Sequence, residues 1–425
     1  MNSINFTTVI RHILVVAFGA GSWIGINAVW VELPLLVNEL PEKWDLPSYM
    51  VVLVQITCIA PLLYGVVKHF YRDRLNQPVL IAAFLVLSAF GSLLCALIWR
   101  KTTYIGNAEH SGGLFGAFAI ISISSTTSDL LFMPYMSTFA PKYLTMFFVG
   151  MGVSALLPSV ISLIQGVGIT RTTEQQLANR TIISTTEYIP PLFSVEVFLF
   201  LIFALVIVSF TSFCLLHWTS LGGRSEMTND MERKYASEEK SEDDANIGEQ
   251  TISEAEKISK SKFCILLFLT TIVGAMQNSI MPTVLSYAAE PYSNLTYHLS
   301  NSLGIMANPI FCLLQFFVQV KRTRTFAILT FITAIFVGYI ILLGLLNKNP
   351  LLNNSAIGPV LCIISSVMSS GLLAYLRATM APVLRDGAKS HENGLFWCGA
   401  FTQIGSFIGA IVMFLLSNVA RVFGG

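Results

Sequence analysis

Long apolar stretches alternate with short polar segments along most of the chain. Because about twenty mainly apolar residues in an α-helix cross the hydrocarbon core of a bilayer, each stretch predicts one spanning helix. Six precede a charged segment, at residues 12–37, 48–68, 77–99, 113–136, 144–166 and 191–217. Five follow it, at residues 263–287, 298–320, 325–346, 356–384 and 394–420. The pattern predicts an all-α integral membrane protein with about eleven transmembrane helices in a 6+5 bundle of two halves.

The charged segment separates the two sets of spans. Residues 219–262 hold eleven Asp or Glu and seven Lys or Arg, with few large apolar side chains. Such a composition cannot bury enough apolar surface to fold, so a disordered cytoplasmic linker is expected, serving as a tether or as a regulatory element. The predicted domains are an N-terminal half at 1–218, this linker, and a C-terminal half at 263–425.

Composition and motifs exclude several classes of function. Apolar residues make up 54% of the chain, charged residues only 12%, and the net charge is +1, so no basic face is available for nucleic acid. We expect the protein to be surrounded by the lipid bilayer instead. The seven cysteines lie scattered in apolar stretches without metal-ligand spacing, so no metal site is expected. Neither paired acids, HExxH, nor a nucleophile with a base at usable spacing is found, which argues against an enzyme.

Positive charges and glycosylation sequons predict the orientation. With the amino terminus in the cytoplasm, the short inner loops and ends hold ten Lys or Arg and the outer ones hold seven. The same arrangement places the sequons at Asn179, Asn294 and Asn353 outside, where glycosylation is expected. We therefore expect a multi-pass protein of the plasma membrane with a cytoplasmic amino terminus and an extracellular carboxyl terminus.

Two amides lie at matching depth in the first span of each half. Asn27 is 16 residues after Arg11, and Asn278 is 16 residues after Lys262, so helical rise puts both about 24 Å above the cytoplasmic boundary. Carriers built from two related halves bind substrate between the halves at mid-membrane. The pair predicts a substrate site there, although hydrogen bonding between helices is the alternative reading.

Further polar and aromatic side chains extend this candidate site. Trp23 and Trp30 flank Asn27 on the same helix and could stack on a flat ring, or belong to an interfacial aromatic belt. Asp129 is an acid deep in a span, where it could bind substrate, carry a proton, or stay protonated and bonded to neighbouring hydroxyls. The remaining substrate-binding candidates within spans are Gln55, Thr127, Gln277 and Asn308.

The chemistry of these residues restricts the cargo. Amides supply hydrogen-bond donors and acceptors without net charge, whereas phosphate recognition favours Arg and Lys, which the middle of the spans nearly lacks. The expected cargo is a small molecule that is neutral, flat and polar at its edges.

Several motifs resemble the eukaryotic riboflavin transporters. The resemblance begins at residues 21–42 (GSWIGINAVWVELPLLVNELPE) and continues through FMPYMS (132–137) and FFVGMGVSALLPSVISLIQG (147–166). In the C-terminal half it includes YHLSNSLGIMANP (297–309), VLRD (383–386) and LFWCGAFTQIGSFIGAIVMF (395–414). It covers residues 10–170 and 263–415, but neither the loop at 167–190 nor the linker.

The resemblance implies an eleven-helix carrier that takes up riboflavin, with halves arranged as in major facilitator and equilibrative nucleoside carriers. Trp23, Asn27, Trp30 and Asn278 fall on matching family positions, whereas Ser125 stands where the family has Asp. We expect riboflavin as the transported substrate, no cofactor and a monomer. The competing hypotheses are a nucleoside or nucleobase carrier, and a membrane receptor that binds flavin without moving it.

Overall fold

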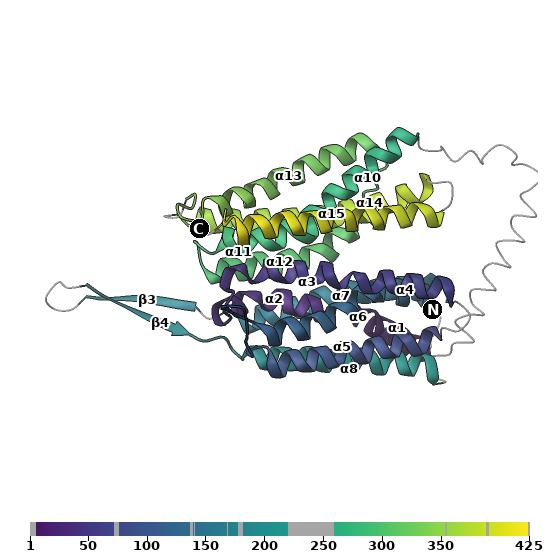
Figure 1. Ribbon diagram of the computed structural model, residues 1–425, viewed down its shortest axis with the longest axis horizontal. Coiled ribbons are helices and arrows are strands. Elements are labelled where there is room, and N and C mark those ends of the chain that lie inside the picture. The colour runs from purple at the N-terminus through teal and green to yellow at the C-terminus, as the bar shows by residue number, and fades with distance from the viewer. Residues whose placement is uncertain are drawn as a thin grey trace, which may run out of the picture.

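A computed structural model describes residues 6–71, 76–136, 139, 141–167, 169–176, 182–219, 259–352, 355–387 and 391–423. Its helices run side by side in two groups, here called the first and second bundles (Figure 1). The first contains α1 (Phe6–Ala20), α2 (Ile24–Glu39), α3 (Leu46–Thr57), α4 (Ile59–Phe70), α5 (Gln77–Ile98), α6 (Gly112–Met136), α7 (Pro141–Gln165) and α8 (Val195–Trp218). The second contains α10 (Lys260–Ala275), α11 (Met281–Ala289), α12 (Asn294–Leu313), α13 (Thr323–Leu345), α14 (Ile357–Gly387) and α15 (His391–Phe414).

Short elements complete the chain. Two antiparallel hairpins, β1 (Thr103–Ile105) with β2 (Ala108–His110) and β3 (Ile169–Gln176) with β4 (Ile182–Ile189), connect helices of the first bundle. We call the end of the molecule that carries these hairpins the hairpin end; the opposite end, where α8 finishes and α10 begins, is the linker end (Figure 1). The remaining short helices are η1 (Lys43–Asp45), η4 (Met276–Ile280), η5 (Leu314–Phe316) and η6 (Leu415–Val419).

The predicted all-α membrane class is confirmed, but the count of apolar spans is corrected. Within the described residues, nine helices are long and apolar enough to cross a membrane, and α1 with α2 forms a tenth span bent by 57°. The predicted eleventh span, 298–320, coincides with α12, which is too polar to qualify. Its Ser300 and Ser302 are buried, because α12 packs against α2, α7 and α14 and meets protein on these sides. At 20 residues α12 is long enough to cross a membrane, so it fails on composition and not on length.

Burial is distributed as expected for a protein surrounded by lipid. Large apolar side chains such as Leu62, Phe268 and Phe331 are more than 60% exposed, whereas many serines and threonines of the spans are buried. Inside the first bundle, the rings of Phe132, Phe147 and Phe213 pack around Phe18 with centroids 5.0 to 5.5 Å away. Apolar groups face outward and hydroxyls pair inside with helix carbonyls, as a bilayer requires.

The first helix of each bundle is interrupted near its middle. A turn at residues 21–23 separates α1 from α2, and the π-helix η4 separates α10 from α11. Single π-helical turns within α-helices are frequent at functional sites, because they redirect side chains. Asn27 follows the interruption in the first bundle, and Asn278 is part of the interruption in the second.

Counting α1–α2, α3–α4 and α10–α11 as one helix each, the interrupted first helix of each bundle lies against the fifth helix of the same bundle, which is α7 in the first and α15 in the second. A Cβ atom on Gly19 of α1 or Gly150 of α7 would overlap backbone atoms of the other helix. The same holds where Gly274 of α10 and Gly405 of α15 approach the partner helix. Only glycine permits such close backbone contact, and it holds α1 on α7 and α10 on α15 in the same way.

Candidate functional site

One face of α2 is partly exposed while the rest of the helix is buried. Between residues 23 and 37, the side chains of Trp23, Asn27 and Trp30 are the partly exposed ones, and they recur at the i, i+4, i+7 spacing of one helix face. A lipid-facing stripe on such a helix would be aliphatic. A stripe of two indoles and an amide instead suits a space between helices.

The second bundle supplies the opposite side through α12. Asn301 donates from Nδ2 to the backbone oxygen of Trp30, and Asn294 Nδ2 lies 3.2 Å from Asn38 Oδ1. These two contacts show that α2 and α12 run antiparallel. Asn308 stands seven residues after Asn301, about 10 Å further along α12 by helical rise, in the direction of the end of α2 that Trp23 precedes.

Asn27 and Asn278 make equivalent contacts in the two bundles. Asn27 Nδ2 lies 3.2 Å from the backbone oxygen and 3.3 Å from Oγ of Ser154 on α7. Asn278 Nδ2 lies 2.9 Å from Oγ of Ser406 on α15. The partners are 127 and 128 residues apart in sequence, as expected for related halves. Each amide is therefore held against the fifth helix of its own bundle.

Two further predicted amides have unpaired oxygens in the second bundle. Gln277 precedes Asn278 in η4, which also contacts α3 of the first bundle. Gln277 Oε1 and Asn308 Oδ1 are both buried and have no hydrogen-bond donor among the described residues. A buried acceptor without a donor is costly, so both oxygens are candidates to accept a hydrogen bond from a ligand.

Gln55 and Thr127 have other partners. Gln403 Nε2 on α15 donates to Gln55 Oε1 at 2.7 Å, which places Gln55 in a contact between the bundles. Thr127 is fully buried, and its hydroxyl donates to the backbone oxygen of Ile123 within α6 at 2.7 Å. The structure thus brings Gln55 to the interface but turns Thr127 into its own helix.

Three predicted residues receive little or no structural description, and a fourth, Asn294, lies at the hairpin end. Asp129 lies in α6, but its side chain is outside the described part of the structure, as are Asn179 and Asn353 entirely. Asn294 begins α12 at the hairpin end and contacts Asn38 of α2. The glycosylation of these asparagines and the role of Asp129 remain predictions.

Several residues of the site were missed by the sequence prediction. Ser154 and Ser406 resembled the small hydroxyl residues that commonly let helices approach, and only their contacts with Asn27 and Asn278 distinguish them. Asn301 could have been found, because it stands seven residues before Asn308 on the same helix face. The structure adds all three to the candidate site.

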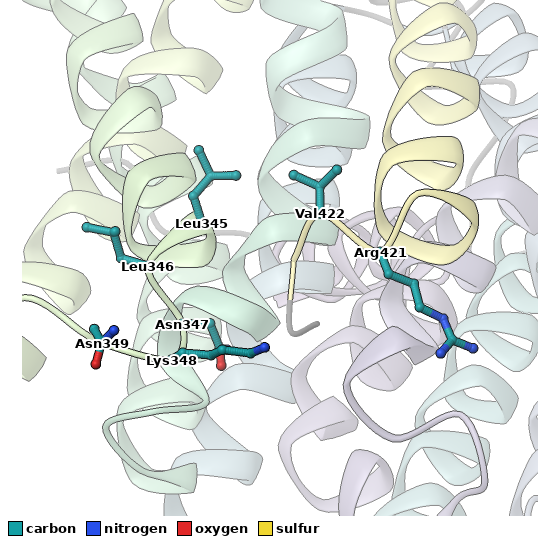
Figure 2. Close-up of a pocket in the computed structure, with 7 residues that line it drawn as sticks. All are labelled: Leu345, Leu346, Asn347, Lys348, Asn349, Arg421 and Val422. Carbon is teal, nitrogen blue, oxygen red and sulfur yellow. The ribbon is translucent and has the colours of Figure 1, made fainter.

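A separate pocket lies at the hairpin end of the second bundle. This cavity of about 220 Å³ lies between the chain after α13 and the chain after η6, and Figure 2 shows the residues that line it. Its lining consists of Leu345, Leu346, Asn347, Lys348, Asn349, Arg421 and Val422. These residues do not overlap the candidate site. Within the described residues, no cluster of three His, Cys, Asp or Glu side chains could hold a metal ion.

Solved transporters share the fold at low sequence identity. A transporter of the POT family in complex with 5-aminolevulinic acid matches 96% of this chain and 91% of its own, with a TM-score of 0.59 and 13% identity. The nucleoside transporter NupG matches 97% of this chain and 90% of its own, with a TM-score of 0.51 and 12% identity. The likeness confirms the predicted major-facilitator-like bundle.

Proteins of higher identity establish the family. Riboflavin transporter rft-2 of Caenorhabditis elegans is 36% identical over 97% of this chain and 96% of its own length. Riboflavin transporter 2 of Salmo salar is 33% identical over 98% and 97%, respectively. The model of the family "Solute carrier family 52, riboflavin transporter" matches residues 7–425. By this nearly complete match, the chain belongs to solute carrier family 52, the riboflavin transporters.

Proposed function

We propose that this protein carries riboflavin across the plasma membrane by alternating access, with the cargo bound between the two bundles. Family membership supports the substrate. The observation that carries the mechanism is the equivalence of Asn27 and Asn278, because each is held by a serine of the fifth helix in its own bundle. Two related halves with matched polar groups at their interface are the architecture of a carrier that rocks around a central site.

The contacts between the bundles support a state closed at the hairpin end. There Tyr287 of α11 donates to Asp45, Ser286 Oγ lies 3.0 Å from the backbone oxygen of Trp44, and Asn418 Nδ2 lies 2.7 Å from Ser48 Oγ. A hydrogen bond between neutral groups contributes about 1 kcal/mol and one to a carboxylate such as Asp45 about 1.5 to 3 kcal/mol, so these few bonds hold the ends together without preventing separation. An alternating carrier needs a closure of this reversible kind.

The hairpin end is proposed to face the cell exterior. Asn294, the described sequon, begins α12 at that end, and the predicted orientation puts Asn179 and Asn353 on the same side. Loss of an endoglycosidase-sensitive mobility shift in Asn179→Gln, Asn294→Gln or Asn353→Gln tests this proposal. A chain that carries no glycan at any of the three would remove its support. The protein is further proposed to act as a monomer, without cofactor and without nucleic acid.

The direct test is uptake of labelled riboflavin by cells that express the chain. Saturable uptake above that of vector-only cells is expected, and the label should be recovered inside as unmodified riboflavin, since the protein is proposed to move its cargo without chemistry. Absence of saturable uptake, with the protein present at the surface, would refute the substrate. Conversion of the cargo in step with uptake would refute the purely transporting role.

Two controls separate the competing functions. Excess lumiflavin should inhibit uptake and excess uridine should not, whereas the reverse order would indicate a nucleoside carrier. Deletion of residues 225–255 should leave uptake intact, because the predicted linker acts as a tether. A receptor that binds flavin and signals through this segment would instead show binding without accumulation.

A further inference from the structure

The orientation of the Asn27 amide is fixed by its partner. A backbone carbonyl oxygen can only accept hydrogen bonds, so the group that faces the Ser154 oxygen at 3.2 Å must be the NH₂ of Asn27. The Ser154 hydroxyl points its own proton at the backbone oxygen of Met151, 2.6 Å away, and therefore also accepts from Asn27. Asn27 consequently turns Oδ1 away from α7.

The same reasoning applies to Asn278 in the second bundle. Ser406 Oγ lies 2.9 Å from the backbone oxygen of Thr402 one turn earlier and 3.2 Å from that of Gly274 on α10, so its proton points to backbone oxygens. Its oxygen is left as the acceptor for Asn278 Nδ2 at 2.9 Å. Rotating the amide by 180° would oblige the Ser406 hydroxyl to turn its proton from these backbone oxygens to Asn278 Oδ1. Ser406 therefore favours the orientation in which Oδ1 of Asn278 faces away from α15.

A third asparagine repeats the arrangement across the interface. Asn301 donates from Nδ2 to the backbone oxygen of Trp30, which again can only accept. The Oδ1 atoms of Asn27, Asn278 and Asn301 have no hydrogen-bond donor among the described residues, and all three side chains are partly exposed. The site between the bundles thus presents several amide oxygens that lack donors.

We propose that the site recognises its cargo by accepting hydrogen bonds, and that the imide N3–H of the flavin ring donates to Oδ1 of Asn278. This inference rests on the proposed transport of riboflavin. Asn278 suits the imide because one of its two amide hydrogens is engaged by Ser406, which leaves an N–H beside Oδ1. That pair of groups matches the neighbouring N–H and C=O of the imide edge. Ser406 is then a positioning residue for specificity.

The proposal predicts how flavins without this donor behave. In 3-methylriboflavin a methyl group replaces the imide hydrogen, so Asn278 Oδ1 would be left without its donor on binding. A site built around a donor typically rejects such an analogue by at least about tenfold. 5-Deazariboflavin is the matched control, because it keeps the N3–H and changes an acceptor elsewhere in the ring.

The experiment measures competition of both analogues against labelled riboflavin uptake. With the wild-type chain, we expect 5-deazariboflavin to compete as well as riboflavin, and 3-methylriboflavin to need at least about tenfold higher concentration. Equal competition by 3-methylriboflavin and riboflavin would overturn the inference and leave the proposed transport standing. Absence of riboflavin uptake would instead overturn the proposed function, and this inference with it.

The role of Ser406 is tested by the ratio between the two analogues. In Ser406→Ala the amide of Asn278 is free to turn, so discrimination against 3-methylriboflavin should fall below about threefold while riboflavin uptake continues. Thr402→Val removes a hydroxyl from the same helix that bonds only Cys398 in its own helix, and should keep the full discrimination. Ser406→Thr, which keeps the hydroxyl, should keep it as well. An unchanged ratio in Ser406→Ala would show that Ser406 is merely structural.

Discussion

Asn27 of α2 and Asn278 of η4 each donate to a serine hydroxyl of the fifth helix in their own bundle, at 3.3 and 2.9 Å. The two contacts join residues 127 and 128 positions apart in sequence. They occur next to the interruptions of α1–α2 and α10–α11. Polar groups within a membrane bundle commonly mark a functional path, and we propose that these two line the path of the cargo.

Replacing either amide should weaken transport more than folding. Asn27→Ala and Asn278→Ala each remove an acceptor for the cargo, so uptake at low substrate concentration should fall about tenfold, as expected for the loss of one hydrogen bond to a neutral group. Surface expression should stay near that of the wild type. Uptake kinetics together with surface biotinylation measure both quantities.

Thr127→Ala is the matched control for these variants. Thr127 lies in the run of hydroxyls from which the sequence predicted a substrate contact, but its hydroxyl bonds to Ile123 within α6. Its replacement should change uptake less than about twofold, because a hydroxyl bonded to its own helix contributes little. If Thr127→Ala impaired uptake as strongly as Asn27→Ala, the site would have to be placed at α6 instead.

The sequence predicted the spans well because the energetic signal for them is strong and local. Each twenty-residue apolar run is decisive by itself, and ten of the eleven predicted spans coincide with a span of the described structure. The exception is 298–320, where α12 has the length of a span but a more polar composition, because it lies against other helices on several sides and can carry polar residues such as Asn301. Hydropathy measures contact with lipid, not contact with protein.

The partners within the site could not be predicted, because they depend on contacts between distant segments. The pairing of Asn27 with Ser154 joins residues of different helices, and the turn at 21–23 changes the direction of α2 by 57°. The helical-rise argument that placed Asn27 level with Asn278 assumed a straight helix. What relates the two amides in the structure is their contact with Ser154 and Ser406, which neither hydropathy nor motif spacing indicates.

Linking Ser48 to Asn418 should stop transport. Asn418 Nδ2 lies 2.7 Å from Ser48 Oγ at the hairpin end. In the double variant Ser48→Cys with Asn418→Cys, a short bifunctional methanethiosulfonate reagent should join the bundles and abolish uptake, and a reductant should restore it. Each single variant treated in the same way is the control, since the seven native cysteines are also free thiols. Full uptake by a verified cross-linked protein would exclude opening at this end.

Replacing Glu32 with glutamine should cost little expression or uptake, whereas replacing it with alanine should lower expression. The Glu32 side chain is 1% exposed, its Oε1 accepts from Gln165 Nε2 at 2.9 Å, and its Oε2 has no donor among the described residues. Glu196 pairs with Arg100 at 3.2 Å, and the described residues give Glu32 no basic partner. A neutral side chain of the same shape can keep the bond to Gln165, while an unpaired buried charge is costly.

Glu32→Gln should therefore retain surface expression and uptake within about threefold of the wild type. Glu32→Ala leaves Gln165 without its acceptor and creates a cavity, so expression should drop severalfold through loss of about 2 to 4 kcal/mol of stability. Glu39→Gln, which alters an exposed ion pair with Arg100, should have almost no effect. Equal damage from Glu32→Gln and Glu32→Ala would mean that the ionised carboxylate is required.

Acid should favour closure of the hairpin end through Glu290. Glu290 follows α11 and lies outside the predicted membrane span. Burial raises the pKa of Glu290 above its ordinary value of 4.5. The hydrogen bond from Asn347 lowers this pKa, and the Asp45 charge of the first bundle raises it. When the bundles separate, burial and Asp45 act less, so the pKa falls and Glu290 releases its proton more readily. The closed state therefore binds the Glu290 proton more tightly than the open state. The contribution of this proton to closure is complete below about pH 4.5 and is lost as the pH rises through the raised pKa of the closed state.

Labelling of a cysteine at Ser48 measures this effect, because Ser48 is buried in the closed state. Near pH 7.5, Ser48→Cys should react faster with a thiol reagent than Ser48→Cys with Glu290→Gln, since the neutral glutamine keeps the end closed. The ratio of the two rates should fall toward one near pH 5, and taking the ratio cancels the pH dependence of the thiol itself. Glu109→Gln on β2, an exposed glutamate bonded to Thr102, should leave the rate unchanged at every pH. A ratio for Glu290→Gln that stays constant from pH 5 to 7.5 would show that the proton on Glu290 does not influence closure.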